Sequence, residues 1–161
     1  MGWHDVGIVR GVSDDGVRPT IPALLLAVAG RGTTRLRHAF AEAGMHDIRP
    51  AHAAALVPLF AGPLHASAVA ERLAVSRQAV AQAVRALERH DYVTRSPDAA
   101  DSRVLRIALT QRGHQALRIM RASALAVEHD WQHELGEKRL DELRATLELL
   151  LKPETCSDPA D

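Results

Sequence analysis

Apolar positions recur at steps of three and four between residues 76 and 90, while polar side chains fill the rest of this segment. This is the spacing of an amphipathic helix with one buried face. The apolar set is Val80, Ala83, Val84 and Leu87, and the segment contains neither glycine nor proline. Ser76 is predicted to cap the helix by accepting a hydrogen bond from a free N–H of the first turn. The pattern therefore predicts a helix over 76–90 that packs by one side.

The other side of this helix carries two amides and two guanidinium groups at i, i+4, i+7 and i+11: Gln78, Gln82, Arg85 and Arg89. Glutamine pairs with adenine edges, and arginine pairs with guanine edges or phosphates. A solvated helix face has the same composition. The segments on either side decide between these interpretations.

Three helices are predicted before residue 76. The first begins after a Thr20 cap, has Pro22 in its first turn and runs through Ala43, with Gly44 as its stop. Its apolar face consists of Leu24, Leu25, Val28, Leu36 and Phe40.

The second helix is predicted from Ala51 to about Phe60, with Leu56, Leu59 and Phe60 as core candidates, and Gly62–Pro63 ends it. Ser67 is predicted to cap a third, short helix that turns Val69, Ala70 and Leu73 inward. Together with the 76–90 helix, this short helix predicts a helix-turn-helix.

The helical spacing of apolar residues ends after His90. Residues 92–95 and 104–109 are rich in β-branched and aromatic residues and are predicted to form two strands. The polar, turn-rich residues 96–102 separate them. The result is a hairpin with Arg103 at the returning edge of its tip.

Thr110 is then predicted to cap a long helix with an apolar seam at Leu117, Met120, Ala124, Val127, Trp131 and Leu135. Gly136 separates it from a last helix with a similar stripe at Leu140, Leu143, Leu147 and Leu150, which Pro153 stops. A small helical core cannot bury both stripes, so a second copy of the chain is expected to cover them. The alternative is that both helices fold back on their own chain.

The 161 residues carry no net charge, but the charge is unevenly distributed. Residues 64–127 hold ten arginines and five acids, whereas residues 128–161 hold four basic residues and ten acids. A basic middle segment is expected where a chain meets a polyanion. The single cysteine, Cys156, permits no disulfide within the chain. Without a signal peptide or a membrane-spanning run, we expect a cytoplasmic protein.

The order of these parts resembles the MarR (multiple-antibiotic-resistance regulator) family of winged helix-turn-helix regulators. The hairpin sequence 98–103, Asp-Ala-Ala-Asp-Ser-Arg, is similar to the family's Asp-x-x-Asp-x-Arg signature, and residues 109–113 are similar to its Leu-Thr-x-x-Gly. Two positions that the family often fills with glycine hold Ala74 and Asp91, and Ser102 replaces a frequent basic residue of the wing.

The resemblance implies a mainly α fold with a small β-hairpin wing, in which long N- and C-terminal helices form a homodimer. We expect an arm at 1–18, a dimerisation helix at 19–48, a DNA-binding lobe at 49–112, dimerisation helices at 113–152 and a tail at 153–161.

The resemblance also implies a transcriptional regulator, of the repressor type, that binds a near-palindromic double-stranded DNA operator. It places Arg77, Gln78, Gln82 and Arg85 in the major groove, Ser76 at a phosphate and Arg103 in the minor groove. Asp101 is expected to support the wing. Arg95 and Arg106 are secondary phosphate candidates, and the alternative for both is a solvated strand arginine.

Members of this family often release DNA when a small aromatic or phenolic ligand binds, and His46, His52 and Phe60 are candidates to line such a site.

His129 and His133 stand at i, i+4, a spacing that can hold zinc, so a metal-responsive regulator is one alternative. A winged-helix protein-interaction module is another. The sequence lacks a phosphate loop and a nucleophile elbow, and it predicts neither an enzyme nor a bound cofactor.

Overall fold

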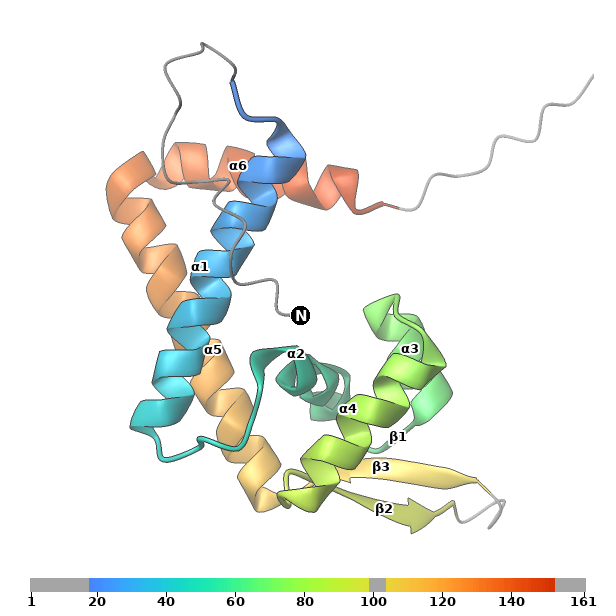
Figure 1. Cartoon of the computed structure of the whole chain (residues 1–161). Coiled ribbons are helices and arrows are strands. Elements are labelled where there is room, and N and C mark those ends of the chain that lie inside the picture. The colour runs from blue at the N-terminus through green and yellow to red at the C-terminus, as the bar shows by residue number, and fades with distance from the viewer. Residues whose placement is uncertain (1–17, 99–103, 153–161) are drawn as a thin grey trace, which may run out of the picture. The chain divides into compact units, whose positions relative to one another are not determined.

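The computed structural model describes residues 18–98 and 104–152, and these are mainly helical with a small antiparallel sheet. The elements, in chain order, are α1 (Ile21–Glu42), α2 (Pro50–Ala53), the 3₁₀ helix η1 (Ala54–Ala61), β1 (Leu64–His65), α3 (Ala66–Leu73), α4 (Arg77–Arg89), β2 (Val93–Pro97), β3 (Leu105–Leu109), α5 (Gln111–Leu135) and α6 (Glu137–Leu150) (Figure 1). The predicted fold class is confirmed.

The sheet has the order β1-β3-β2, with antiparallel pairing throughout. Val93 pairs with Leu109 and Pro97 with Leu105, so the predicted hairpin is present. The sequence did not predict β1, whose Leu64 pairs with Ile107. This third strand ties the start of α3 to the hairpin.

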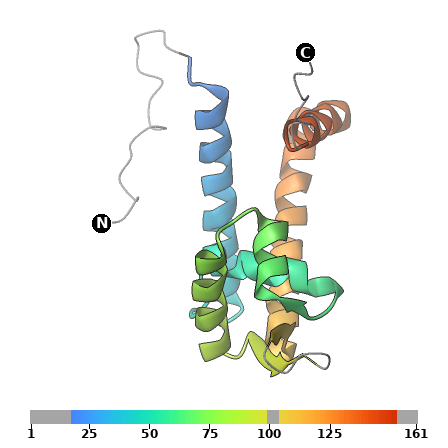
Figure 2. The same ribbon diagram turned by 90° about the vertical axis from the view of Figure 1, so that its right-hand side faces the viewer.

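Helices α3 and α4 form the predicted helix-turn-helix, seen from a second side in Figure 2. All four apolar residues predicted for α4 are buried, together with Val69 of α3 and Ile107 of β3. The turn between the helices passes through Ala74 in the left-handed region, with φ of 51°. Asp91, directly after α4, is also left-handed, with φ of 58°. Asp tolerates this conformation better than most side chains do.

Three sequence predictions about the segment before α4 are wrong. The helix expected from Ala51 to Phe60 is divided into α2 and η1, and Phe60 is 72% exposed instead of belonging to the core. Pro58 lies inside η1 and has no N–H to donate to an α-helical ladder. Ser67 is not a cap, because α3 begins at Ala66 and its N-cap residue, His65, makes no side-chain capping bond.

Helix α1 follows the prediction closely. Thr20 caps it, with Oγ1 accepting from the Ala23 N–H at 3.4 Å, and Gly44 follows the helix with φ of 72°. Phe40 is buried in the core, whereas the predicted apolar residues Leu24, Leu25 and Val28 are exposed on the single chain. The first half of α1 therefore presents an uncovered apolar face.

The chain divides into two compact units, the first ending at Ser123 and the second beginning at Ala124. In the second unit Leu140 is buried, and Arg144 lies 3.4 Å from Glu128 across the turn at Gly136. Among the described residues, no helix is long and apolar enough to cross a membrane.

Candidate nucleic-acid interface

Helix α4 presents its polar face to solvent because its four apolar residues are used in the core. Ser76 caps the helix as predicted, and its Oγ accepts from the Ala79 N–H at 3.1 Å. Arg77, Gln78, Gln82 and Arg85 are all exposed. Within residues 18–98 and 104–152, neither Arg77 nor Arg85 has a carboxylate partner in reach of its guanidinium group. These cationic groups are therefore available to an external anion.

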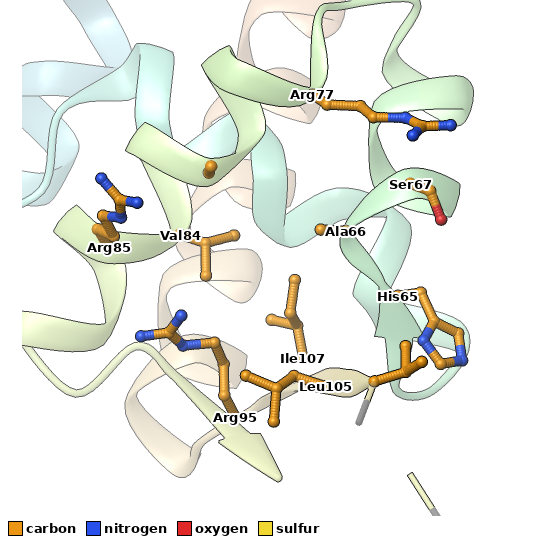
Figure 3. A pocket seen from close by; sticks show the side chains of 11 residues that line it. His65, Ala66, Ser67, Arg77, Val84, Arg85, Arg95, Leu105 and Ile107 are labelled. Atoms are coloured by element: carbon orange, nitrogen blue, oxygen red, sulfur yellow. The ribbon is translucent and has the colours of Figure 1, made fainter. Parts of the chain in front are cut away.

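Two grooves lie beside α4, and Arg85 lines both of them. The first, of about 460 Å³, is lined by Gln82, Arg85, Glu88 and Arg89. The second, of about 470 Å³, separates α3 and α4 from the strands. Figure 3 shows Val84, Leu105 and Ile107 in the middle of this second groove, with Arg85 and Arg95 on one side and Arg77, Ser67 and His65 on the other. Arg85 therefore lies between the two grooves, and its side chain is accessible from both.

Arg95 on β2 is joined to Glu88 on α4 by two side-chain contacts. Its Nε lies 2.9 Å from Oε1 of Glu88, and its Nη2 contacts Oε2. The hydrogen bond and the charge of Arg95 hold the pKa of Glu88 below its ordinary value, although partial burial opposes this. The pair connects the recognition helix to the hairpin and gives Arg95 a carboxylate partner that the sequence did not predict.

Arg106 on β3 also has protein partners. Its Nη2 donates to the Pro63 carbonyl at 2.9 Å, and its Nε lies 3.6 Å from Asp98 Oδ2. His65 Nε2 lies 3.1 Å from the same oxygen. These contacts join the part of the hairpin next to its tip to β1 and to Pro63. Arg103 and Asp101, which the sequence placed at the hairpin tip, lie outside the described residues.

Near the end of α4, three side chains meet around the carboxylate of Asp47. Tyr92 Oη donates to Oδ1 at 2.7 Å, Arg112 Nη2 lies 3.0 and 2.9 Å from the two oxygens, and His90 Nδ1 lies 3.2 Å from Oδ2. The Arg112 guanidinium also lies 4.6 Å from the centre of the Tyr92 ring. Sequence reasoning missed this cluster because 65 residues separate Asp47 from Arg112 and no local period links them.

The cluster shifts the pKa values of Asp47 and Tyr92. Burial would raise the pKa of Asp47, but the hydrogen bond from Tyr92 and the charge of Arg112 outweigh it and lower this pKa. Burial and the hydrogen bond to Asp47 raise the pKa of Tyr92 to about 12. Asp47 is therefore an anion, and Tyr92 is a neutral donor, at neutral pH.

The three candidate ligand residues lie near the start of the lobe. His46 is exposed in the loop after α1, His52 is partly buried in α2, and Phe60 is on η1. None of them lines either groove beside α4. Burial, followed by the charges of Arg49 and Arg89, lowers the pKa of His52.

His129 and His133 lie one turn apart on α5, and both are exposed. No group of three or more His, Cys, Asp or Glu side chains suited to a metal ion is found in the part of the chain that the structure describes. A zinc site built on these two histidines would need a further ligand from elsewhere.

Two helices joined by a turn and followed by a β-hairpin, with a cationic outer face on the second helix, define a winged helix-turn-helix protein. Residues 46–104 match the model of the MarR family. The resemblance seen in the sequence is thereby confirmed, because the matched residues span α2, the helix-turn-helix and the first hairpin strand, β2. The search of curated proteins found no match.

Solved structures with the same fold include a probable transcriptional regulator from Pseudomonas aeruginosa, with a TM-score of 0.69, 22% identity and coverage of 82% of this chain and 97% of that one. A MarR transcriptional regulator from Methanosarcina mazei Go1 gives 0.69 and 19%, with 81% and 92% covered. The transcriptional repressor CouR, solved bound to a 23-mer DNA duplex, gives 0.68 and 22%, with the same coverage of 81% and 92%.

Proposed function

We propose that this protein is a transcriptional regulator, not an enzyme, that acts in the cytoplasm by binding a near-palindromic DNA operator as a homodimer. The observation that carries the proposal is the outer face of α4. There, Arg85 stands between two grooves without a carboxylate partner among the described residues. The five net positive charges of residues 64–127 favour the same partner, and the similar protein CouR was solved on DNA.

Within this proposal, Gln78, Gln82 and Arg85 contact base edges in the major groove, because amide and guanidinium groups match adenine and guanine. Near the N-terminus of α4, Ser76 and Arg77 contact the phosphate backbone of the DNA. Arg103 enters the minor groove. Arg95 and Arg106 are secondary phosphate contacts, and each must exchange or share its carboxylate partner, Glu88 or Asp98, to reach DNA.

The homodimer is supported by apolar side chains that the single chain leaves exposed. On α1, Ile21 and Leu26 are 68% and 76% exposed, and on α6 Leu149 and Leu150 are 65% and 66% exposed. Such faces on a folded chain mark interaction surfaces. A second copy that covers them by two-fold symmetry would carry two α4 helices to successive major grooves, about one helical turn apart.

The remaining parts of the proposal come from the family resemblance. These are that the protein represses its target and that a small aromatic or phenolic ligand releases it, with His46, His52 and Phe60 as candidate contacts. A panel of phenolic compounds tests this part: a true ligand raises the melting temperature and lowers operator affinity. A panel that moves neither quantity removes the ligand from the proposal.

The experiment that tests the main proposal is selection of bound duplexes from random DNA by the full chain. We expect an inverted repeat to be enriched. We also expect Gln82→Ala and Arg85→Ala each to cost about 1–3 kcal/mol on that repeat and to relax its sequence preference. Arg118→Ala, at an exposed arginine of α5, is the matched control and leaves the affinity unchanged.

Two outcomes of the same experiment support the alternatives. A protein-interaction module would enrich no sequence and would bind DNA without the steep salt dependence of phosphate contacts. A metal-responsive regulator would change its operator affinity when zinc is added, and His129→Ala would abolish that change.

A further inference from the structure

We infer that Asp47, together with Arg112 and Tyr92, positions the C-terminal end of α4 for reading DNA sequence, an inference that rests on the proposed function. The carboxylate of Asp47 is the common acceptor for side chains from the end of α4, the start of the hairpin and the first turn of α5. None of the three residues belongs to the polar face of α4.

The contacts come from three separate segments. His90 is the C-cap residue of α4, Tyr92 directly precedes β2, and Arg112 lies in the first turn of α5. Asp47 itself is in the loop between α1 and α2, where its side chain is 26% exposed. A single carboxylate thus fixes the chain on both sides of the turn that follows α4.

Backbone contacts carry this restraint into the helix. Arg112 Nη1 donates to the His90 carbonyl at 3.0 Å, and the Tyr92 N–H donates to the Leu87 carbonyl at 2.9 Å. The Thr110 hydroxyl donates to the Asp91 carbonyl. The turn therefore holds the Leu87 carbonyl of α4, and Arg112 of α5 holds the carbonyl of the C-cap residue His90, in addition to the apolar packing of Leu87.

A restraint of this kind affects specific and non-specific binding differently. Hydrogen bonds to base edges weaken steeply when their distances and angles change. Attraction to the phosphate backbone depends on the number of neutralised charges and tolerates small displacements. Loosening the end of α4 should therefore reduce affinity for the correct sequence while leaving affinity for any other sequence unchanged.

The test is Asp47→Asn, which keeps the side-chain shape and removes the charge that Arg112 and His90 share. Its affinity is measured on the duplex selected by the wild-type protein and on a scrambled duplex of the same length, over a range of salt concentrations. We expect the ratio of the two affinities to fall by roughly 3- to 30-fold. We expect the affinity for the scrambled duplex and the salt slope to stay at their wild-type values, with melting confirming a folded protein.

Arg112→Gln should reproduce this result, and the double variant should be no worse than either single variant because both remove one contact set. Arg112→Lys keeps a single ion pair and should restore part of the ratio. Tyr92→Phe, which deletes a single hydroxyl, serves if Asp47→Asn does not fold, and it should lower the ratio in the same direction. Arg118→Gln is the control, because Arg118 is an exposed arginine of α5, the helix that also carries Arg112.

An unchanged ratio for Asp47→Asn, or for Tyr92→Phe in its place, would overturn the inference. So would an equal loss on both duplexes, or a changed salt slope, because either would assign the cluster to phosphate binding or to general stability. If the wild-type protein itself does not prefer the selected duplex, the proposed function fails, and this inference fails with it.

Discussion

Gly113, in the first turn of α5, lies against the backbone of the residue that begins the hairpin. A Cβ atom at this position would stand 2.1 Å from the Tyr92 carbonyl oxygen and 3.2 Å from Leu109 Cδ2. Replacing glycine with alanine inside a helix usually stabilises it by about 1 kcal/mol. At Gly113 the methyl group instead has to displace backbone atoms.

We therefore predict that Gly113→Ala lowers the free energy of unfolding by about 1–3 kcal/mol, as overpacking does, measured by chemical denaturation. Gly30→Ala is the matched control on α1, because nothing lies within 4 Å of its added Cβ. It should gain about 0.5–1 kcal/mol. A gain at Gly113 would contradict the close approach of α5 to Tyr92.

Asp47 gives a pH-dependent prediction. Its pKa in the folded protein is below the ordinary value. The contribution of Asp47 to the free energy of unfolding is therefore complete above about pH 4, where its carboxyl group is ionised in the unfolded chain. This contribution is lost as the pH falls further. The difference in unfolding free energy between wild type and Asp47→Asn should be constant near neutrality and should shrink in acid. A difference that does not change between pH 7 and pH 3 would show that the charge of Asp47 adds nothing.

At the scale of residues, the sequence predicted the burial of those side chains whose apolar positions recur at helical spacing. Val80, Ala83, Val84 and Leu87 are buried because their spacing places them on one helix face. Asp47 could not be predicted in the same way, since its partners are brought to it by the tertiary fold. Phe60 was predicted to be a core residue of a helix that runs from Ala51 to about Phe60, and in the 3₁₀ helix η1 its side chain is exposed.

At the scale of elements, the two serines next to the helix-turn-helix should behave differently. Ser76 accepts the Ala79 N–H at 3.1 Å, whereas Ser67 lies inside α3 and caps nothing. We predict that Ser76→Ala destabilises the protein by about 1 kcal/mol, as the loss of a cap does, measured by thermal or chemical unfolding. Ser67→Ala should stay within about 0.5 kcal/mol of wild type. Equal losses at both serines would contradict the cap at Ser76.

The helices α1, α4, α5 and α6 were predictable because each is long, periodic and bounded by a cap or a glycine. The strand β1 was not predictable, since Leu64–His65 is too short to show alternation and exists through its pairing with β3. The expected helix is divided into α2 and η1, and Pro58 inside η1 lacks the N–H that an α-helical hydrogen bond requires, a constraint that the apolar pattern does not show.

At the scale of the whole molecule, binding to both halves of a near-palindromic operator requires a homodimer. Leu25, on the apolar stripe of α1, is 41% exposed on the single chain. We predict that Leu25→Glu places a charge in the subunit interface and converts the dimer to monomer, with loss of operator binding, as measured by sedimentation velocity and mobility shift. Val57→Glu makes the same change at an exposed apolar position of η1 and should remain dimeric. A Leu25→Glu protein that stays dimeric would remove α1 from the interface.

The class of the molecule followed from the order of its parts together with the 98–103 and 109–113 motifs. The second copy was expected from two apolar stripes that a small lobe cannot bury, and both stripes keep exposed residues in the structure. Neither the operator nor a ligand is encoded in such patterns, because both depend on the detailed shape of surfaces that the period of a helix does not specify.

A mobility-shift titration on two duplexes that contain the same selected half-sites tests directly whether a homodimer binds both half-sites at once. In one duplex the half-sites have their selected spacing, and in the other about five base pairs are inserted between them, which turns one half-site to the opposite face of the DNA. Two α4 helices held by a dimer should bind the first duplex at least tenfold more tightly. Equal affinity for the two duplexes would show that the protein does not bind the two half-sites as a dimer.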